Sequence, residues 1–555
     1  MVAIKKSTIV LLALLAIFFF RGLYLNSYHS LTSDEPVIYT GLALWKTGNF
    51  EHSPTHPPAM KLLTAIFTLP LHPNIVIPEG FPNIDEFLYG RQLIFQFNQQ
   101  IFQKMIDWGR FPALLLGLLA AVYVYKWASE ITNKKSALLA VTLYIFFPSI
   151  VALSAVADND IMITAFFLMT AYYFKHYISG NSTKDAVLTG VCLGVTLLSK
   201  HTGILVIPIM LFASLIILFT SHKLPMLKFI PSNNQNFKRS ILAIIAFFVF
   251  IGIISAAVVN AGYFFQGTFT PLGEYKFEQN FFPIFNSPAL SWIPVPLPYW
   301  YLKGLETNQI FSVNAHYFHG NWVTTEDWYF FIFSFLVKTP IPLLIMLLIA
   351  LVFYKKLSVN KRIDMILILL TVVGITLFFS LKQYKLGIRH LLPIYPFMFI
   401  LVAMLWHHVS EVNMVRLKKF LMLMFAWYLI STTIVHPYYL SYMNGFVGGS
   451  ENGYKWFLDS NVDWGQDLNA VKSWMDKSGY NEIGLSYYGS DVPQIRGIKS
   501  HMIPCEKTTG LHVLSINNLY GNIFTGQPKN CYEWLRNIQP TDRIGYSMLV
   551  YNIPQ

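Results

Sequence analysis

Two adjacent carboxylates, Asp34 and Glu35, follow the first strongly apolar run of the chain, which extends from Ile9 to Phe20. A carboxylate acts as a general base when it lies within hydrogen-bond reach of the proton that it removes. On a non-helical backbone the two side chains point in different directions, so one can meet a substrate hydroxyl while the other meets a cation or a backbone amide. The alternative is that Ser33 or Asp34 caps a helix that starts at Pro36, where acidic residues are favoured. The two interpretations are compatible, because capping would also orient the acid.

A second acidic group, Asp158 and Asp160, stands at the start of another apolar segment. Its structural alternative is again a helix N-cap. Together with Asp34, these carboxylates could hold a divalent cation or an acceptor sugar, because carboxylate oxygens suit both hard cations and hydroxyl donors. The sequence alone leaves the metal requirement open.

Basic residues form the complement of these acids. They are Lys200, His201, Lys338, Lys385, Arg389 and His390. A cluster of cations at the level of the lipid headgroups is what a lipid-linked phosphate or pyrophosphate requires. The alternative for each residue taken alone is snorkelling toward the headgroups. Lys338 falls within an apolar segment, so we expect it to face a cavity rather than lipid, and Arg389 is the foremost candidate for binding the phosphate.

Three further residues could position a loop or an acceptor: His56, Lys61 and Asp463. His56 precedes two prolines, which signal a turn, and Lys61 follows close behind. Asp463 is expected to cap a helix that carries an amphipathic stripe. The aromatic stretch 292–301 is expected to lie in a membrane interface, with stacking against a sugar as the alternative.

The elements that must position these residues are mostly membrane helices. The chain has 555 residues, of which 54% are hydrophobic and 12% charged, whereas a soluble globular protein has about 25% charged residues. With about 20 apolar residues needed for each crossing, we expect roughly eleven spans, of which the fifth is short. They lie near residues 7–25, 110–128, 134–151, 160–178, 185–199, 203–220, 240–261, 328–354, 362–381, 390–406 and 416–435.

Lysine and arginine set the expected orientation. Every loop on the side of the N-terminus is basic in this arrangement, as the positive-inside rule requires of cytoplasmic loops. The net charge of +12 therefore has its source in these loops and does not indicate nucleic-acid binding. The opposite face receives the loops 26–109 and 262–327 and everything after residue 436. The candidate residues then gather on this outer face, with Lys338 in the span beneath it.

The C-terminal part, 441–555, differs in character from the membrane module 1–440, because its hydrophobicity falls and its turn residues increase. An amphipathic helix is expected after Asp463. Strand-like runs follow at 483–488, 512–516 and 544–551. Cys505 and Cys531 either form a disulfide in this part or remain separate thiols. The predicted fold is thus an all-α polytopic membrane protein with a small extracytoplasmic α/β domain at its C-terminus.

Several motifs of nucleotide- and metal-dependent enzymes are missing from the sequence. It has no P-loop and no Gly-rich dinucleotide fingerprint after a strand, and no Cys/His cluster has the spacing of a zinc site. The classes that remain are a membrane enzyme, a transporter or flippase for lipid or sugar, and a non-catalytic scaffold. A transporter predicts ionisable residues in mid-span and broken helices. Here the polar groups gather in large outer loops, which favours an enzyme.

In their order along the chain, these residues resemble the polyprenyl-phosphate-dependent membrane glycosyltransferases of the GT-C class, and within it the bacterial relatives of protein O-mannosyltransferases and of the lipid A aminoarabinose transferase. The resemblance runs through nearly the whole chain. It is carried by Asp34-Glu35 with His56-Pro57-Pro58, Asp158 to Asp160, Leu193-Gly194 through Lys200, Lys338-Thr339-Pro340, Gly387 to Pro393, and Ser460 to Leu468. The aminoarabinose transferases have a lysine in the region where this chain has His56, and this departure weakens the transfer of their specificity.

This resemblance implies transfer of a sugar from a polyprenyl-phosphate carrier to a glycan, lipid or protein acceptor, usually with inversion at the anomeric carbon. It places the protein in the bacterial inner membrane, with the N-terminus in the cytoplasm and the site outside. Asp34 is then the expected base, and Glu35 and Asp158 position the acceptor or a divalent cation. The departing phosphate would be stabilised by these cations: Arg389, Lys200, His201, Lys338 and His390.

Overall fold

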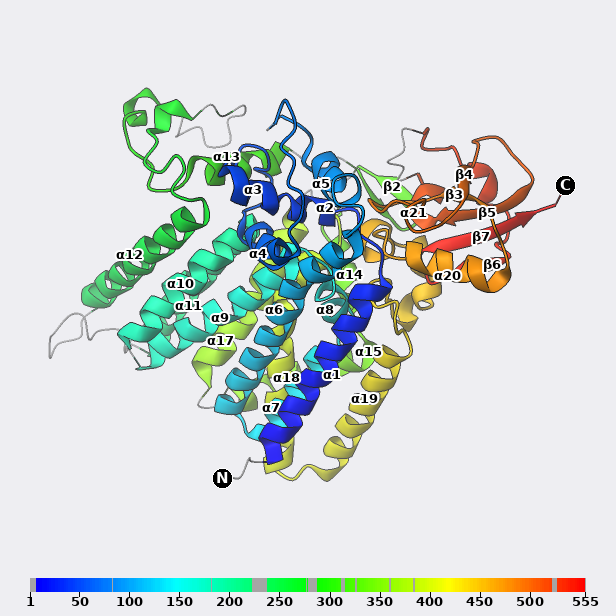
Figure 1. The fold of residues 1–555 in the computed structure, drawn as a ribbon. Helices are drawn as coiled ribbons and strands as arrows, with labels where there is room; N and C mark the ends of the chain where they lie inside the picture. Colours follow the sequence, from blue (N-terminus) through cyan, green and yellow to red (C-terminus); the bar gives the residue numbers. More distant parts are fainter. Residues whose placement is uncertain are drawn as a thin grey trace, which may run out of the picture.

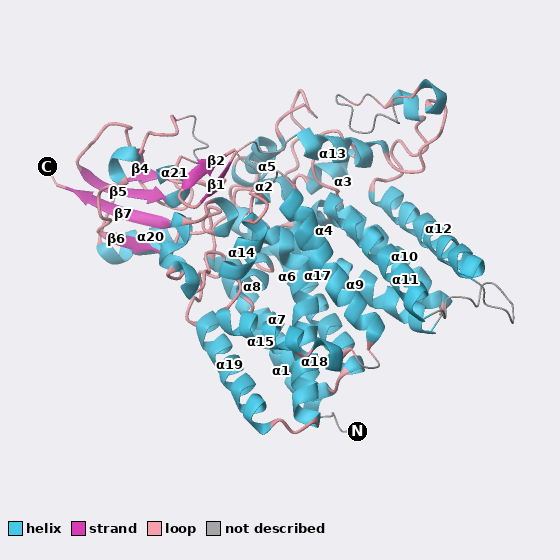
Figure 2. Ribbon diagram, turned by 180° about the vertical axis from the view of Figure 1, so that it is seen from behind, coloured by secondary structure: helices cyan, strands magenta, loops and turns pink. Residues whose placement is uncertain are grey.

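The computed structural model describes residues 6–81, 83–180, 182–221, 237–275, 277, 287–310, 315–324, 327–358, 361–382, 385–521 and 527–554. Figure 1 shows the long helices side by side in one bundle, with short helices and loops over one end of it and a β-sheet beside them. Seen from behind in Figure 2, the strands are confined to the same end of the molecule as those loops. This loop end, and the helix ends beneath it, carry the candidate residues.

Every predicted apolar segment is largely helical. The helices of the bundle are α1 (Lys6–Tyr28), α6 (Phe102–Ile131), α7 (Lys134–Phe146), α8 (Pro148–Leu153), α9 (Asn159–Gly180), α10 (Thr183–Ser199), α11 (Val206–Ser221), α12 (Phe237–Gly262), α14 (Phe330–Lys338), α15 (Ile341–Val352), α16 (Tyr354–Leu357), α17 (Arg362–Leu381), α18 (Tyr395–Glu411) and α19 (Val415–Thr433). Short 3-10 turns precede two of them, η2 (His201–Leu205) before α11 and η7 (Ile388–Ile394) before α18.

Two predicted spans are interrupted at prolines. Phe147 takes an extended conformation before Pro148 and separates α7 from α8, and Thr339 does the same before Pro340, where α14 and α15 meet at a bend of 112°. The ring of a proline disfavours the helical conformation of the residue before it. Within the described residues, six helices are long and apolar enough to cross a membrane, or seven if the bent pair is one span. The structure thus supports fewer full crossings than the eleven predicted.

The bundle is built around α18. The apolar window of residues 388–411 is 100% buried, whereas those of α1 and α12 are 17% and 28% buried. α18 packs against α6, α7 and α15. A long apolar helix that remains exposed on the outside of a bundle requires a lipid surrounding. The protein is therefore an integral membrane protein with a protein-lined centre and a lipid-facing periphery.

The loop end is assembled from short helices that pack through glycines. They are α2 (Glu35–Tyr39), α3 (Gly41–Thr47), α4 (Ala59–Thr68), α5 (Glu86–Phe95) and α13 (Tyr299–Ile310), with the hairpin β1 (His316–Phe318) and β2 (Asn321–Val323). A Cβ on Gly41 would lie 1.9 Å from the carbonyl oxygen of Lys61, and one on Gly90 would lie 2.0 Å from that of Pro36. These close approaches fix α3 on α4 and α5 on α2, and so hold the loops that carry Asp34 and His56.

The C-terminal part contains a five-stranded mixed sheet in the order β4-β3-β5-β7-β6. Its elements are α20 (Leu468–Ser478), β3 (Ile483–Ser486), β4 (Ser500–Met502), β5 (Gly510–Ser515), α21 (Ile516–Leu519), β6 (Asp542–Ile544) and β7 (Met548–Ile553). The predicted strand 544–551 divides into β6 and β7, and β4 was not predicted. Cys505 and Cys531 form a disulfide.

The expected cap at Asp463 is wrong, because α20 begins at Leu468. Gly465 has a φ of +85°, which lies in the left-handed region that only glycine adopts freely. A helix cannot run through this position, so the segment between Asp463 and α20 forms an irregular loop. This loop reaches the candidate site, as described below.

Candidate active site

A cavity of about 510 Å³ opens at the loop end of the bundle. Its lining includes Asp34, Thr55, His56, Asp85, Glu86, Asp158, Asn159, His316, Tyr317, Trp322, Lys385, Arg389, Asp459 and Tyr488. These residues come from the first outer loop, the loop before α9, the β1–β2 hairpin, η7 and the C-terminal part. Figure 1 shows α2, α5 and β2 close together over that end of the bundle. The structure therefore brings distant parts of the sequence together around one polar cavity.

Arg389 stands between three carboxylates, of which those of Asp34 and Asp158 line the cavity. One of its terminal nitrogens lies 3.1 Å from Oδ2 of Asp34. The other lies 3.5 Å from Oδ2 of Asp158 and 3.9 Å from Oδ2 of Asp160. The Asp34 side chain is 36% exposed, against 10% for Asp158 and 1% for Asp160. Asp34 is thus the member of the group that a substrate can reach most easily.

Asp34 occupies the N-cap position of α2 but makes no capping hydrogen bond through its side chain. The carboxylate instead faces Arg389, whose guanidinium supplies the nearby positive charge. Helix capping alone therefore does not account for this residue. Its side chain belongs to the cavity.

Two residues of the C-terminal part hold the Arg389 guanidinium and its backbone in place. The guanidinium lies 4.4 Å from the ring centroid of Trp464, a cation–π arrangement. The side chain of Asn461 accepts a hydrogen bond from the amide of Ile388 and donates one to the carbonyl of Leu386, both at 3.0 Å. The sequence motif from Ser460 to Leu468 was recognised, but its contact with Arg389 was not predicted.

Glu35 lies outside the cavity, in an ion pair with Arg110 that is fully buried on both sides. Two guanidinium nitrogens of Arg110 donate to the two carboxylate oxygens, each at 2.7 Å. Glu35 also accepts hydrogen bonds from the amides of Thr32 and Ala157, at 2.8 and 2.9 Å. The carboxylate therefore ties the loop of Asp34 to the loop of Asp158. Its oxygens are occupied by the protein, which makes it a positioning residue rather than an acceptor-binding one.

Replacing Glu35 by glutamine should destabilise the fold. Removing one member of a buried ion pair leaves the other charge without compensation and typically costs about 3–5 kcal/mol. The measurement is thermal unfolding of the purified variant in detergent, with Glu51→Gln as the control, because Glu51 is exposed and surface changes stay within about 0.5 kcal/mol. A Glu35→Gln protein that unfolds at the same temperature as the wild type would contradict this structural role.

Asp158 and Asp160 differ in their surroundings. Nζ of Lys200 lies 2.7 Å from Oδ1 of Asp160, so Lys200 neutralises this deeper carboxylate. Burial and the neighbouring charge of Asp160 raise the pKa of Asp158 well above its ordinary value, while Arg389 opposes that rise. A negative group that binds Arg389 would therefore compete with Asp158.

A hydrogen-bonded chain orients His56 in the cavity. The hydroxyl of Thr55 donates to Glu86, whose carboxylate also lies 3.5 Å from Nζ of Lys61. Because that hydroxyl hydrogen is used, Oγ1 of Thr55 can only accept from Nδ1 of His56, 3.1 Å away. Burial, reinforced by the charges of Lys61 and Lys200, lowers the pKa of His56 well below its ordinary value. The imidazole is thus neutral, and its Nε2 is left as a hydrogen-bond acceptor.

Only Asp34, His56, Asp158 and Arg389 of the twelve predicted site residues line the cavity, and the eight outside it are Glu35, Lys61, Asp160, Lys200, His201, Lys338, His390 and Asp463. Nζ of Lys338 donates to the carbonyls of Leu440 and Asn461, at 2.7 and 2.6 Å. The ring of His390 packs with Phe331 and Phe379, and that of His201 with Tyr301. Asp463 accepts hydrogen bonds from Ser515 and from the amide of Gly465. Lys338 therefore holds Asn461, whose side chain bonds the backbone just before Arg389. Asp463 holds its loop against strand β5 of the C-terminal sheet.

The sequence also missed residues on the C-terminal side of the cavity. The hydroxyl of Tyr488 donates to Oδ2 of Asp459 at 3.4 Å. Asp459 has a φ of +56°, which is uncommon for a residue other than glycine. Burial raises the pKa of Asp459, as does the charge of Asp34, whereas Arg389 lowers it. Tyr488 ends the strand predicted at 483–488, although β3 stops at Ser486, and Asp459 begins a short 3-10 turn, so no pattern in the sequence directs either residue to the cavity.

The carboxylates do not form a metal site in this arrangement. Among the described residues, no group of three or more histidine, cysteine, aspartate or glutamate side chains is placed to hold a metal ion. The positive charge beside Asp34 and Asp158 comes from the guanidinium of Arg389, and that beside Asp160 comes chiefly from Lys200. The donor set therefore fits an arginine better than a divalent cation.

A helical bundle with a lipid-facing periphery and a charged cavity at one end defines the class: a polytopic membrane protein with a polar site at the membrane surface. Residues 91–254 match the model of the family described as dolichyl-phosphate-mannose-protein mannosyltransferase. This match confirms the resemblance that the motif order indicated. No curated protein matches the chain in sequence.

Several solved structures match this chain at low identity. The apo form of ArnT from Cupriavidus metallidurans is 12% identical, with 99% of this chain and 100% of that chain covered and a TM-score of 0.45. The same enzyme bound to undecaprenyl phosphate is 11% identical, with 99% of each chain covered and a TM-score of 0.43. The apo oligosaccharyltransferase of Archaeoglobus fulgidus is 13% identical, with 95% and 68% covered and a TM-score of 0.42. At scores this low, no residue role is transferred to this chain.

Proposed function

We propose that the protein is an integral membrane glycosyltransferase that moves a sugar from a polyprenyl-phosphate carrier to an extracytoplasmic acceptor, with inversion at the anomeric carbon. The observation that carries the proposal is the position of Arg389, held among carboxylates in a cavity at one end of an apolar bundle. A prenyl chain requires an apolar surrounding, and a phosphate requires a cation beside it. The family match over residues 91–254 supports the same reaction class.

In this mechanism the acceptor oxygen attacks the anomeric carbon, and the bond from that carbon to the carrier phosphate breaks. Asp34 takes the proton of the acceptor hydroxyl, because it is the most exposed of the three carboxylates around Arg389. Arg389 stabilises the negative charge on the departing polyprenyl phosphate. Asp158 releases the guanidinium when the phosphate binds, since the charge on this buried carboxylate is already disfavoured.

The orientation and the division of the chain belong to the same proposal. The N-terminus would lie in the cytoplasm of a bacterium, which puts the basic loops inside. The membrane module would comprise residues 1–440, and 441–555 would form an extracytoplasmic domain. The Cys505–Cys531 disulfide supports this placement, because disulfides persist in oxidising compartments.

The test is incubation of the purified protein in lipid nanodiscs with a set of polyprenyl-phosphate sugars and candidate glycan, lipid and peptide acceptors. Formation of free polyprenyl phosphate together with a glycosylated acceptor is the expected result for at least one pair. Transport of an intact lipid-linked sugar across a vesicle membrane without carrier release would contradict the proposal and favour a flippase. Addition of a chelator tests any requirement for a divalent cation.

His56 is expected to accept a hydrogen bond from a hydroxyl of the sugar or acceptor through Nε2. Its replacement by alanine should lower kcat/KM about tenfold. A neutral hydrogen bond is worth about 1 kcal/mol, and its loss also leaves the substrate hydroxyl without a partner in the cavity. Thr55→Val should reproduce much of this loss by releasing the imidazole, while Thr55→Ser should retain activity. Steady-state kinetics with the acceptor varied check the prediction, and equal activity of Thr55→Val and Thr55→Ser would contradict it.

A further inference from the structure

A short apolar hairpin begins directly after the end of α12. Its two arms are residues 263–275 and 287–298, called the aromatic hairpin below. The amide of Phe269 donates to the carbonyl of Val295 at 2.9 Å, and the amide of Val295 donates back to Thr270 at 3.1 Å. Figures 1 and 2 both show this segment beyond the end of α12, at the level of the outer loops and on the side of the molecule opposite the C-terminal sheet.

The aromatic hairpin exposes large apolar side chains. Phe265 is 62% exposed, Phe269 63% and Trp292 73%. In the two arms as the structure describes them, the only charged side chain is that of Glu274. Several large exposed rings in one short segment indicate contact with a partner or a membrane.

The outward position of the rings is fixed by the backbone. Phe264, Phe265 and Phe269 have φ values of 51°, 58° and 65°, a conformation that bulky residues adopt only when their surroundings impose it. The amide of Phe265 donates to the carbonyl of Asn260 at 2.7 Å, and the side-chain amide of Asn260 donates to the carbonyl of Pro296 at 3.1 Å. Asn260 thus anchors both arms to the last turns of α12.

The exposed surface of α12 leads directly to these rings. Ile245, Val249 and Ile253 are 53%, 56% and 66% exposed on this helix, which is long and apolar enough to span a membrane. The helix ends at Gly262, and the aromatic hairpin starts at the next residue. Its first residues, including Phe265, therefore lie beside the point where a span leaves the hydrocarbon, which is where aromatic rings concentrate in membrane proteins.

We propose that the aromatic hairpin inserts into the lipid leaflet at which α12 ends, with Phe265, Phe269 and Trp292 at the boundary between headgroups and acyl chains. The rings of Tyr275 and Tyr299 stack at 4.9 Å, which joins the hairpin to α13. A Cβ on Gly304 of α13 would lie 2.2 Å from the carbonyl oxygen of Pro54, so α13 packs closely on the loop that carries His56. Insertion of the hairpin therefore anchors one side of the cavity to the membrane.

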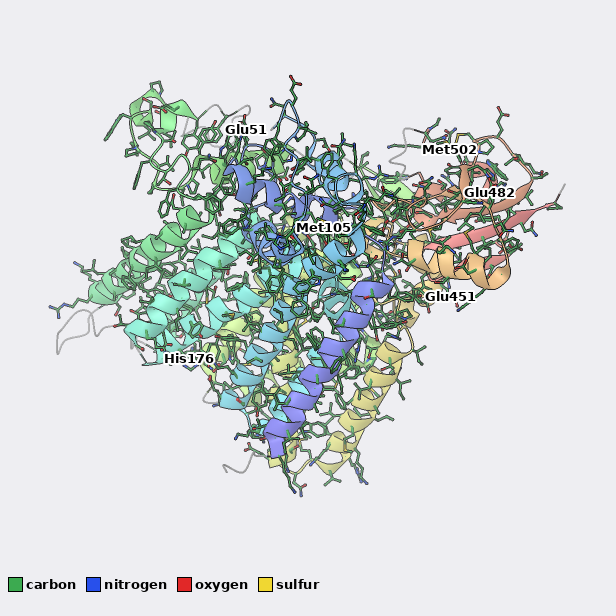
Figure 3. The ribbon with its side chains drawn as sticks, in the orientation of Figure 1. Glu51, Met105, His176, Glu451, Glu482 and Met502 are labelled. Atoms are coloured by element: carbon green, nitrogen blue, oxygen red, sulfur yellow. A yellow bond between two sulfur atoms is a disulfide. The ribbon has the colours of Figure 1, made fainter. Side chains whose placement is uncertain are left out.

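The test uses nitroxide labels on single cysteines in the full chain, with Cys192→Ala removing the buried free thiol and the Cys505–Cys531 disulfide left intact. Labels at Phe265→Cys and Trp292→Cys are compared in lipid vesicles for collision with oxygen, which partitions into lipid, and with a water-soluble nickel chelate. Ile253→Cys on α12 is the lipid-facing control. Met502→Cys is the aqueous control, since Met502 is 65% exposed and lies on the C-terminal sheet far from the hairpin (Figure 3).

The expected result is an oxygen-to-nickel ratio at positions 265 and 292 that exceeds the ratio at 502 severalfold and approaches that at 253. A ratio at either hairpin position equal to that at 502 would overturn the proposal, because the rings would then lie in water or against protein. The outcome does not depend on sugar transfer, so failure of this proposal and failure of the proposed function are distinguishable.

Discussion

Replacing Asp34 by asparagine should reduce sugar transfer by a factor of about 10²–10⁴, the usual contribution of a general base. Asparagine has nearly the same shape and can still accept a hydrogen bond from Arg389, 3.1 Å away in the wild type, but it cannot take up the proton of the acceptor. Membrane insertion and thermal stability should remain close to the wild type. Single-turnover release of free carrier from a polyprenyl-phosphate sugar measures the effect.

Asp85→Asn is the matched control for this change. Asp85 lines the same cavity, and its side chain caps α5 by accepting from the amide of Leu88, a role that asparagine fulfils equally well. The control alters the charge of the cavity as much as Asp34→Asn does, without touching the proposed base. Near-normal turnover of Asp34→Asn would remove this residue from the mechanism, and an equal loss in both variants would assign the effect to the field of the cavity alone.

Replacing Arg389 by lysine should cost about 3–4 kcal/mol of transition-state stabilisation, the scale found for a well-placed electrostatic donor. Lysine keeps the charge but loses the planar fork that meets Asp34 and Asp158 together and the stacking on Trp464. The predicted loss is therefore in kcat, with a smaller change in the affinity for polyprenyl phosphate.

Arg91→Lys serves as the control for the arginine prediction, because Arg91 donates to the carbonyl of Ser490 at 3.1 Å and does not line the cavity. It should retain the wild-type rate. Should Arg389→Lys also retain that rate, bidentate contact by the guanidinium would have no part in catalysis. A fall in melting temperature that accompanies the loss of rate would indicate a structural role for Arg389. Measuring both the rate and the melting temperature of Arg389→Gln separates the loss of catalysis from the loss of stability.

The sequence predicted that Asp34, Asp158 and Arg389 lie on one face, because this expectation follows from topology. Asp34, Asp158 and Arg389 each stand at the end of an apolar segment, and an alternating path through a membrane puts such ends on a common face. That these residues share one cavity agrees with this expectation. The individual roles assigned to them remain proposals.

Other residues could not be assigned because their partners lie far away in the sequence. Glu35 is paired with Arg110, which stands within the long helix α6, and nothing local marks this arginine as buried. Lys338 binds backbone carbonyls, which carry no sequence signal. His201 and His390 pack against aromatic rings, as histidines in apolar surroundings often do.

In the fold, too, some features follow from the local sequence and others do not. Apolar length predicted the helices, but the breaks at Phe147 and Thr339 depend on single prolines that the length criterion ignores. Aspartate is favoured at helix N-caps, which is why Asp463 was expected to cap a helix. Because Gly465 has a positive φ, α20 begins only at Leu468. Strand β4 has only three residues and no alternation that would reveal it.

The most direct test of the account is a double-mutant cycle of Asp34→Asn and Arg389→Lys, measured as single-turnover release of polyprenyl phosphate. If the two side chains act on one reacting centre in one cavity, their effects are not additive, and the double variant should be little slower than the slower single variant. Losses that multiply would show that Asp34 and Arg389 act independently of each other, and would contradict the coupling that the account requires.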